Sequence, residues 1–201
     1  MKTFIIVVVI IVGITLVFQT YMTMAADNSD SQPYKVIKIE KDFEIRYYPS
    51  TTMASITSDS KTYKQLGSTG FRKLAGYIFG GNEANTKIAM TAPVYMDIND
   101  SASTMSFVMP LGYNLANLPK PNDADIAFHV TSTKYMAALS FSGYADDEKI
   151  KEYTEKLENA LKTASIPYKG RFLFLGYNAP YQFFGRRNEI VINVIWENKI
   201  N

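Results

Sequence analysis

The feature that most limits the possible folds of this chain is an order of predicted elements that occurs twice from Tyr34 onward. Each half is expected to hold two strands, one helix and then two more strands. Units of this kind pack as an antiparallel sheet with helices against it, so the pattern predicts an α+β fold. Two copies of one unit also predict a pseudo-two-fold axis.

The first half shows the periodicities of strands and of a helix in turn. Its predicted strands are 43–47, 51–57, 87–94 and 105–109, and its predicted helix is 61–79. The helical pattern ends at Gly80-Gly81-Asn82, because these residue types are common helix stops. A connector that contains Pro110, Pro119 and Pro121, residues 101–123, leads to the second half.

The second half repeats this plan. Its predicted strands are 126–130, 135–141, 172–177 and 190–196, and its predicted helix is 146–164. Either Asp146 or Asp147 is expected to cap that helix. The buried face of the helix is predicted to comprise Ile150, Tyr153, Leu157, Ala160 and Leu161.

The two halves also share a short proline motif. Thr91-Ala92-Pro93 in the first half resembles Asn178-Ala179-Pro180 in the second. Because proline cannot donate a hydrogen bond to a strand ladder, each motif is predicted to be a bulge or strand exit, where a ligand can reach the backbone.

Composition excludes several classes of site. The 201 residues include no cysteine and one histidine, which rules out disulfides, thiolate metal sites and zinc sites built on several histidines. The formal net charge is +2 and no run of Lys or Arg stands out, so no nucleic-acid partner is indicated. Hydrophobic residues make up 47% of the chain, enough to bury the core of one domain, which is expected over residues 34–198.

Residues 1–26 are predicted to form a targeting segment. Lys2 precedes a wholly uncharged run, 4–18, and Thr23-Met24-Ala25 offers small residues to a signal peptidase. Because the charge-free stretch continues to Ala26, membrane attachment through residues 4–26 is the alternative. In both cases the domain is expected to be exported, on the non-cytoplasmic side.

The segment 177–189 is the most informative candidate site. Tyr177, Tyr181 and Phe183 belong to an aromatic loop that is followed at once by Arg186 and Arg187. Aromatic rings beside guanidinium groups suit a flat ligand that carries carboxylates. The alternative is that the arginines pair with Glu189 and neighbouring acids and close the sheet.

The possible acid, base and metal-binding residues give weaker signals. Glu189 with Tyr177 could activate a water molecule in a cleft, which is a hydrolase hypothesis. His129 alternates with the large apolar residues of its strand, so it is expected to face solvent rather than to bind iron or another metal. No pair of residues has a spacing that demands catalysis.

Three glycines interrupt the first predicted helix. Gly67, Gly70 and Gly76 each cost about 1 kcal/mol relative to alanine. Either they let the helix backbone pack closely on the sheet, or they form a shallow groove for a flat apolar ligand. Arg72 and Lys73 lie beside this face and could reach ligand carboxylates.

Taken together, these residues resemble the SOUL/haem-binding protein family. The matching blocks are 43–48, 70–82, 87–94, 107–110, 118–121, 141–145, 176–180 and 185–190, in family order. The resemblance implies a distorted antiparallel β-barrel with two helices and a pseudo-two-fold repeat, similar to bacterial GyrI-like effector-binding domains. It also implies non-catalytic binding of haem or free porphyrin in a shallow apolar groove between the first helix and the loop before the last strand. The histidine that some members use lies upstream of the 43–48 strand, and this chain has none there, so no axial residue is assured.

The residues expected to bind the tetrapyrrole combine the helix and the loop. They are Phe71, Arg72, Leu74, Ile78, Tyr177, Tyr181, Phe183, Arg186 and Arg187. The arginines would neutralise the propionates, and the apolar residues would cover the ring. The alternative function is a general binder of hydrophobic small molecules or peptides.

Overall fold

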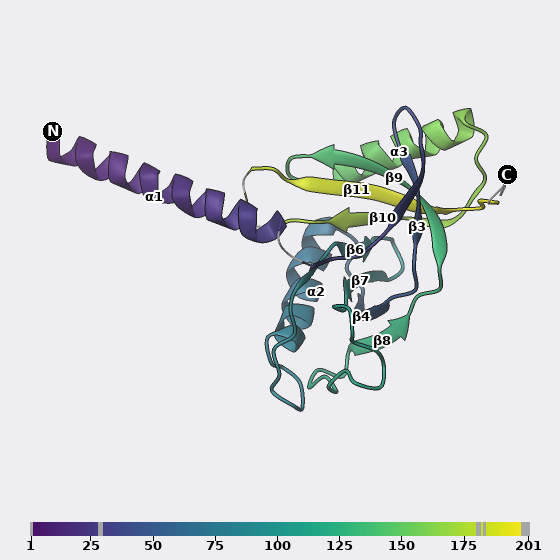
Figure 1. Ribbon diagram of the computed structural model, residues 1–201, viewed down its shortest axis with the longest axis horizontal. Helices are drawn as coiled ribbons and strands as arrows, with labels where there is room; N and C mark the ends of the chain where they lie inside the picture. The colour runs from purple at the N-terminus through teal and green to yellow at the C-terminus, as the bar shows by residue number, and fades with distance from the viewer. Residues whose placement is uncertain (1, 28–29, 180–181, 183, 198–201) are drawn as a thin grey trace.

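The computed structural model describes residues 2–27, 30–179, 182 and 184–197 (Figure 1). Their elements are α1 (Lys2–Asp27), β1 (Asp30–Ser31), β2 (Lys35–Ile39), β3 (Glu44–Tyr48), β4 (Thr52–Ser58), α2 (Tyr63–Ile78), β5 (Thr91–Ala92), β6 (Val94–Asp97), β7 (Ser103–Val108), β8 (Ile126–Val130), β9 (Lys134–Ser142), α3 (Asp147–Thr163), β10 (Tyr168–Gly176) and β11 (Arg187–Val194).

Most strands of the described chain join one antiparallel sheet, in the order β2-β3-β9-β11-β10-β6-β7-β4-β8. The strands β8, β4, β7 and β6 mirror β3, β9, β11 and β10 across the central pair of β6 and β10. The first strand of each half pairs with the second strand of the other, so Ile45 lies opposite Ala137 and Phe128 lies opposite Ala54. This exchange confirms the pseudo-two-fold repeat and ties the halves together.

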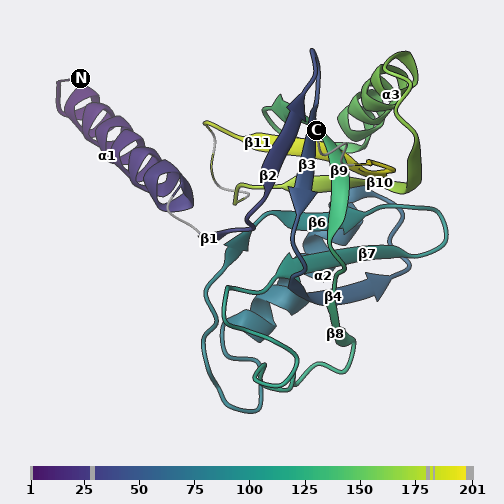
Figure 2. The ribbon, with the colours of Figure 1, turned by 45° about the vertical axis from the view of Figure 1, so that its right-hand side comes forward.

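The sheet is open, which corrects the expectation of a closed, distorted barrel. Within the described residues its edges are β2 and β8. The exchange of first strands places β3 and β8 near opposite ends of the sheet. A closed barrel would require the edge strands β2 and β8 to hydrogen-bond to each other, but the full width of a twisted sheet separates them. Figure 2 shows that α2 and α3 cover the same face of this open sheet.

The main core lies between the sheet and these two helices. Leu66, Leu74 and Ile78 of α2 and Leu157 and Leu161 of α3 are at most 1% exposed. Each fully buried side chain of this size stabilises the fold by about 1.5–3 kcal/mol. A smaller cluster on the opposite face comprises Tyr48, Met53, Tyr95, Val108, Met136, Ala138, Leu175 and Val191.

Side-chain caps account for the starts of both helices. The Thr62 hydroxyl accepts a hydrogen bond from the Gln65 amide at 3.2 Å, and the Asp146 carboxylate accepts one from the Lys149 amide at 2.8 Å. The Asp146 cap is as expected from the sequence. The α2 helix ends before Gly80, whose φ of +111° strains any residue with a side chain.

The region before β6 differs from its prediction. Residues 87–90 form no strand, and β5 and β6 flank a cis peptide bond between Ala92 and Pro93. Pro93 therefore precedes β6, whereas Asn178 and Ala179 follow β10, so the two proline motifs are not counterparts. They are neighbours instead, because β6 and β10 run antiparallel and Val94 lies opposite Gly176. Pro180 lies outside the described residues.

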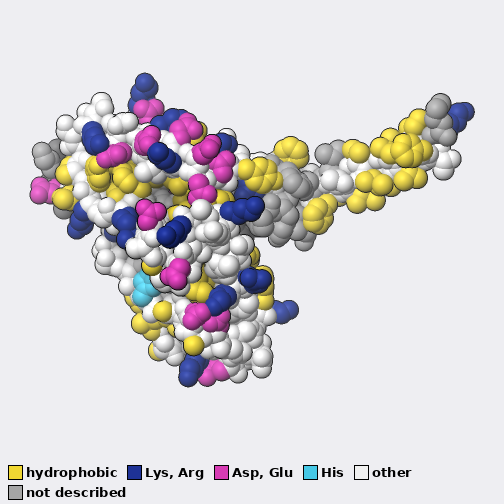
Figure 3. All heavy atoms as spheres, turned by 180° about the vertical axis from the view of Figure 1, so that it is seen from behind, with side chains coloured by type: hydrophobic (Ala, Val, Ile, Leu, Met, Phe, Trp, Pro, Cys, Tyr) yellow, Lys and Arg dark blue, Asp and Glu magenta, His cyan; other side chains and the backbone are white. Residues whose placement is uncertain are grey.

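The N-terminal helix α1 extends away from the sheet and its two covering helices (Figure 1). Exposed apolar side chains run along it from Phe4 to Phe18 (Figure 3). Among the residues that the structure describes, no helix has the combined length and apolar character needed to cross a membrane.

Candidate functional site

The predicted site residues of α2 fall into two groups. Leu74 and Ile78 are buried in the core and face the sheet. Phe71 is half-buried, with its ring 5.4 Å from that of Phe107 in an edge-to-face arrangement. Arg72 is exposed, and no described residue forms an ion pair or hydrogen bond with it. Of these four side chains, Arg72 is therefore the one that a ligand outside the domain can reach without rearrangement.

The glycines of α2 play two different parts. A Cβ atom at Gly70 would lie 3.3 Å from the Cβ of Met105 and 3.4 Å from the Cγ2 of Ile56, so this glycine allows close packing on the sheet. A Cβ atom at Gly67 or Gly76 would meet no described atom within 4 Å. Close packing therefore explains Gly70 alone, and Gly76 leaves bare backbone on an exposed face.

We name the residues Ser68, Arg72, Gly76 and Phe79 the outer face of α2. They recur at spacings of three or four residues and so lie on one side of the helix and its C-cap. All four are exposed, and Phe79 is 59% exposed despite its size. The sequence pattern assigned no role to Phe79, although its position three residues after the bare Gly76 could have identified it.

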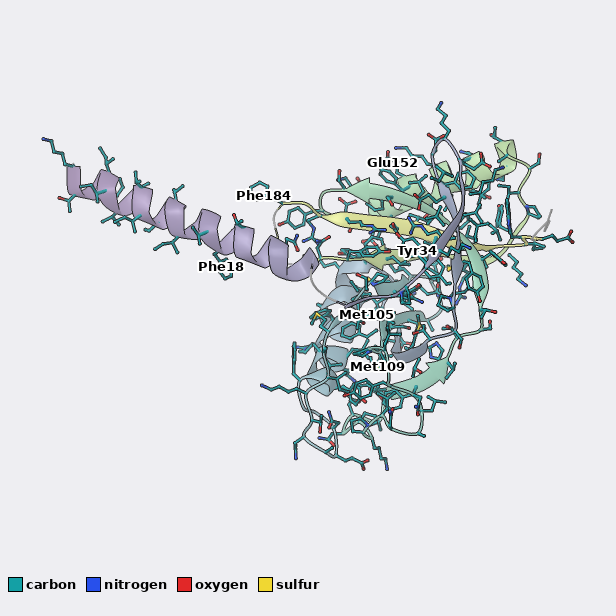
Figure 4. All side chains as sticks on the ribbon, in the orientation of Figure 1. Phe18, Tyr34, Met105, Met109, Glu152 and Phe184 are labelled. Atoms are coloured by element: carbon teal, nitrogen blue, oxygen red, sulfur yellow. The ribbon has the colours of Figure 1, made fainter. Side chains whose placement is uncertain are left out.

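The loop before β11 is held together by Arg186. This side chain is buried, and its guanidinium donates to the carbonyls of Ala179 and Gln182 at 2.8 and 2.9 Å. It also lies 4.5 Å from the ring centre of Tyr144. Its Nη1 and its face are thus used inside the protein, whereas its buried Nε–H has no hydrogen-bond partner among the described residues. Tyr181 and Phe183 lie outside the described residues, whereas Phe184 is 64% exposed and points away from the domain (Figure 4).

Glu189 is the centre of a buried network on the face of the sheet opposite the helices. Arg46 donates to both of its carboxylate oxygens, at 2.8 and 3.1 Å. Tyr177 and Ser140 donate hydroxyl groups at 2.7 and 2.8 Å. Arg187 adds a guanidinium contact at 2.7 Å. Sequence reasoning missed Arg46 and Ser140, because strand pairing alone brings them to Glu189.

The charges of this network determine the protonation of Glu189. Burial alone raises the pKa of its carboxyl, but the hydrogen bond and charge of Arg46, together with Arg187 and Tyr177, lower the pKa to about 2. Burial and the neighbouring carboxylate raise the pKa of the Tyr177 hydroxyl. A carboxylate of such low basicity, with four donor side chains around it, is suited to structure and poorly suited to general-base catalysis.

Arg187 joins this network to the surface. Its guanidinium stacks 4.2 Å from the ring centre of Tyr177 and donates to the Tyr34 hydroxyl at 3.1 Å. The side chain is nevertheless 42% exposed. The two adjacent arginines therefore differ: Arg186 closes the loop, and Arg187 keeps part of its side chain in solvent. Figure 4 shows Tyr34 lying over the sheet beside this region.

His129 is exposed on β8, as expected. Its Nδ1 lies 3.3 Å from the Ser55 hydroxyl, and partial burial together with the charge of Lys134 lowers its pKa. Phe128 contacts the helix side of the sheet, so His129 faces the other side. The described residues contain no cluster of three or more histidine or acidic side chains that could hold a metal ion.

The proteins that this chain resembles in sequence are described as heme-binding proteins. The model of the family described as SOUL heme-binding protein matches residues 29–193. Heme-binding protein 2 of Mus musculus is 29% identical over 174 residues, which cover 83% of this chain and 81% of that protein. Heme-binding protein 1 of Xenopus laevis is 28% identical over 165 residues, covering 77% and 86%.

Solved structures resemble this one in fold. The C-terminal domain of EcmrR superposes with a TM-score of 0.57 at 11% identity, covering 82% of this chain and 99% of that one. A hydrolase from Listeria innocua superposes with a TM-score of 0.55 at 5% identity, covering 79% and 94%. At such identities the likeness extends to the α+β architecture and carries no residue roles.

Proposed function

The chain belongs to the SOUL heme-binding protein family, and from this premise we propose that it binds haem or a related tetrapyrrole without catalysing a reaction. The family match runs from β1 to β11 and so includes the whole sheet with α2 and α3. The relatives named heme-binding proteins match over most of their own lengths.

We place the ligand against the outer face of α2. The observation that carries this placement is Gly76, an exposed helical residue with open space where a side chain would stand. A flat macrocycle can approach the backbone there, with Phe79 on one side and Arg72 on the other. Burying part of the exposed Phe79 ring favours binding by about 25 cal/mol for each Å² removed from water.

Arg72 is the proposed partner of a ligand carboxylate. It is free of partners among the described residues, so binding would not have to break an internal ion pair. Arg187 is the second candidate, because its side chain is 42% exposed, although it already contacts Glu189. Contact by Phe71, Tyr177, Tyr181, Phe183 and Arg186 stays a prediction.

We propose that the macrocycle, rather than the iron, provides most of the binding free energy. His129 faces away from the helix side of the sheet, and α2 lies on that helix side. Hemin and metal-free protoporphyrin IX should therefore bind with similar affinity, and His129→Ala should leave both affinities unchanged.

Titration of the full chain with both porphyrins tests this function, followed by absorbance or by quenching of tryptophan fluorescence. Gly76→Leu should abolish binding, because its side chain fills the bare face without a clash inside the protein. Arg72→Ala should weaken binding about tenfold, and the matched control Arg171→Ala, at an exposed arginine on β10, should not. Absence of saturable binding would refute the function, whereas binding that both α2 variants leave intact would refute its placement.

Export is a separate proposal. Residues 1–26 would act as a signal peptide, supported by Lys2 and the uncharged run that follows it. Expression of the full chain in a secreting host, with N-terminal sequencing of the product, tests this. Recovery of the intact N-terminus in the cytoplasmic fraction alone would contradict it.

A further inference from the structure

A groove on the helix-covered side of the sheet lies between α3 and the strands β3 and β9. Its volume is about 890 Å³, and its lining includes Asp42, Phe43, Leu139, Tyr153, Lys156 and Ala160. Phe43 and Leu139 are buried and form an apolar floor, whereas Lys156 is exposed at the rim. The groove shares no residue with the outer face of α2.

The pseudo-two-fold axis gives this groove a counterpart in the first half. Leu74 and Ile78 of α2 hold the same positions as Leu157 and Leu161 of α3, with all four in the core beneath the helices. The strand β8 corresponds to β3, and β4 corresponds to β9. The counterpart of the groove therefore lies between α2 and β8.

The connector of the same chain fills that counterpart. The Tyr77 hydroxyl donates to the carbonyl of Pro119 at 3.0 Å, and its ring lies 5.4 Å from that of Phe128. Tyr113 and Leu118 of the connector pack against the core. Between α2 and β8 the protein thus binds a proline-containing segment of itself, most of which is in turns.

Ion pairs hold the C-terminal end of this segment against α2. Lys73 of α2 forms ion pairs with Asp123, at 3.5 Å, and with Asp125. Both acids follow the proline-rich stretch of the connector. The segment therefore combines apolar side chains with acidic residues that meet a helix lysine.

The second half has a lysine equivalent to Lys73, but no segment of the described chain fills its groove. Lys156 stands where Lys73 does, one residue before the buried leucine in each helix. Ala160 stands where Tyr77 does, so the ring that occupies the first site has no equivalent. The segment that precedes β3 forms β2 along its outer edge instead of crossing to α3. This site is consequently left open.

We propose that the α3 groove binds a proline-containing acidic peptide of a partner protein, in the manner in which α2 and β8 hold the connector. The apolar side chains of the peptide cover Phe43, Leu139 and Ala160, and its acidic residues meet Lys156. This inference is independent of tetrapyrrole binding, because the two sites use different helices.

The charges around the groove determine the direction of the peptide. Lys156 pairs with Glu152 at 2.6 Å, but both side chains are more than half exposed, so an incoming carboxylate can displace that weak pair. At the other rim lie Lys41, Asp42 and Glu40, and Glu40 pairs with Lys38 at 2.6 Å. The acidic end of the peptide therefore belongs beside α3 and away from the turn between β2 and β3. Figure 3 shows this mixture of acidic and basic side chains over the side of the molecule that carries α3.

A peptide with the sequence of the connector can serve as the probe for binding to the α3 groove. A fluorescent peptide with the sequence of residues 113–125, added to the full chain, should give a saturable rise in anisotropy below about 1 mM. Ala160→Tyr places in α3 the ring that Tyr77 places in α2, and it should weaken binding at least about tenfold. Lys156→Gln should weaken it about threefold, and more at low salt. A peptide with Asn at the positions of Asp123 and Asp125 should lose the same factor.

Control measurements distinguish a specific loss of peptide binding from unfolding of the variant and from an effect on the porphyrin site. Thermal melting of Ala160→Tyr reports whether the variant is folded, and Lys151→Gln is a matched exposed lysine of α3 outside the groove. Porphyrin titration should be unchanged in Ala160→Tyr. The proposal is overturned by absence of saturable binding, by equal binding to folded Ala160→Tyr and wild type, or by displacement of the peptide with hemin, which would assign the groove to a small molecule.

Discussion

The two halves of the domain share one backbone plan but place large and small side chains at opposite ends of their helices. In α2, Gly70 lets the backbone approach the sheet and Tyr77 fills the far end. In α3, Tyr153 stacks on Phe141 with ring centres 4.2 Å apart, and Ala160 leaves the far end open. Repetition of the backbone therefore does not repeat the surface, because side-chain volume decides which spaces are filled.

The opposite face of the sheet shows a second difference between the halves. Arg46 on β3 and His129 on β8 are equivalent, lying opposite Met136 and Met53 in their respective ladders. Arg46 enters the buried ionic network of Glu189, whereas His129 hydrogen-bonds to the Ser55 hydroxyl. One half is thus held by charge on this face and the other by neutral hydroxyl groups.

The largest expected loss of stability comes from removing the buried carboxylate of the charged half. Glu189→Gln should lower the free energy of unfolding by about 3–5 kcal/mol, because it removes the buried carboxylate that pairs with Arg46 and leaves the partly exposed Glu44 as the remaining ionic partner of that guanidinium. The equivalent residue in the other half is Thr104, whose hydroxyl lies 3.1 Å from that of Thr57. Thr104→Val should cost about 1 kcal/mol in the same urea titration. Equal losses would show that the two half-sheets are held in the same way.

Acid should weaken the charged half next most strongly. The pKa of Glu189 is lowered from 4.5 to about 2 in the folded protein, so its contribution is present above the unfolded value and is lost as pH falls toward the folded one. The loss should approach about 3 kcal/mol. Urea unfolding of wild type and Glu189→Gln should therefore converge between about pH 5 and pH 2. Parallel pH curves would contradict the lowered pKa.

A smaller effect tests the packing of the two helices. Gly70→Leu should destabilise the protein by about 1–3 kcal/mol, because Met105 and Ile56 already occupy the space around its Cβ position. The corresponding change in α3, Tyr153→Leu, removes a half-buried ring and introduces no clash. A thermal shift of Gly70→Leu no larger than that of Leu placed at Gly67 would contradict close packing of α2.

The smallest expected effect has the opposite sign. Gly76→Ala should stabilise the fold by about 1 kcal/mol, because the position is helical and open. The same methyl group should weaken porphyrin binding several-fold if the ring approaches this backbone. Chemical denaturation and porphyrin titration of one variant measure both. Stabilisation without weaker binding would separate the glycine from the proposed site.

The sequence predicted the helices and most strands well, because each has strong local periodicity. The helix 61–79 was observed as Tyr63–Ile78, and 126–130 was observed unchanged as β8. The segment 87–94 was predicted as a strand interrupted by Pro93; β5 and β6 do lie on either side of that proline, whereas residues 87–90 form no strand. The strand β2 was missed, since its apolar side chains lie on a sheet edge and are mostly exposed.

The candidate site was predicted only in part. The sequence identified the basic and aromatic residues near β11 but not their partners. Arg186 binds loop carbonyls, and its contact with a ligand stays a prediction. The alternative that Arg187 pairs with Glu189 is confirmed. No periodicity within 177–189 could reveal Arg46, because that contact joins strands far apart in the chain.

The sequence by itself determined the family, the repeated order of elements and the N-cap of α3, because these depend on local pattern and on residues in a recognisable series. Tertiary structure decided that the sheet is open, that Glu189 is fully engaged, and that no described segment of the chain fills the groove beside α3, whereas the connector fills its counterpart beside α2. The physical reason is that local patterns specify which face of an element is buried, whereas pairing between distant segments specifies what that face is buried against.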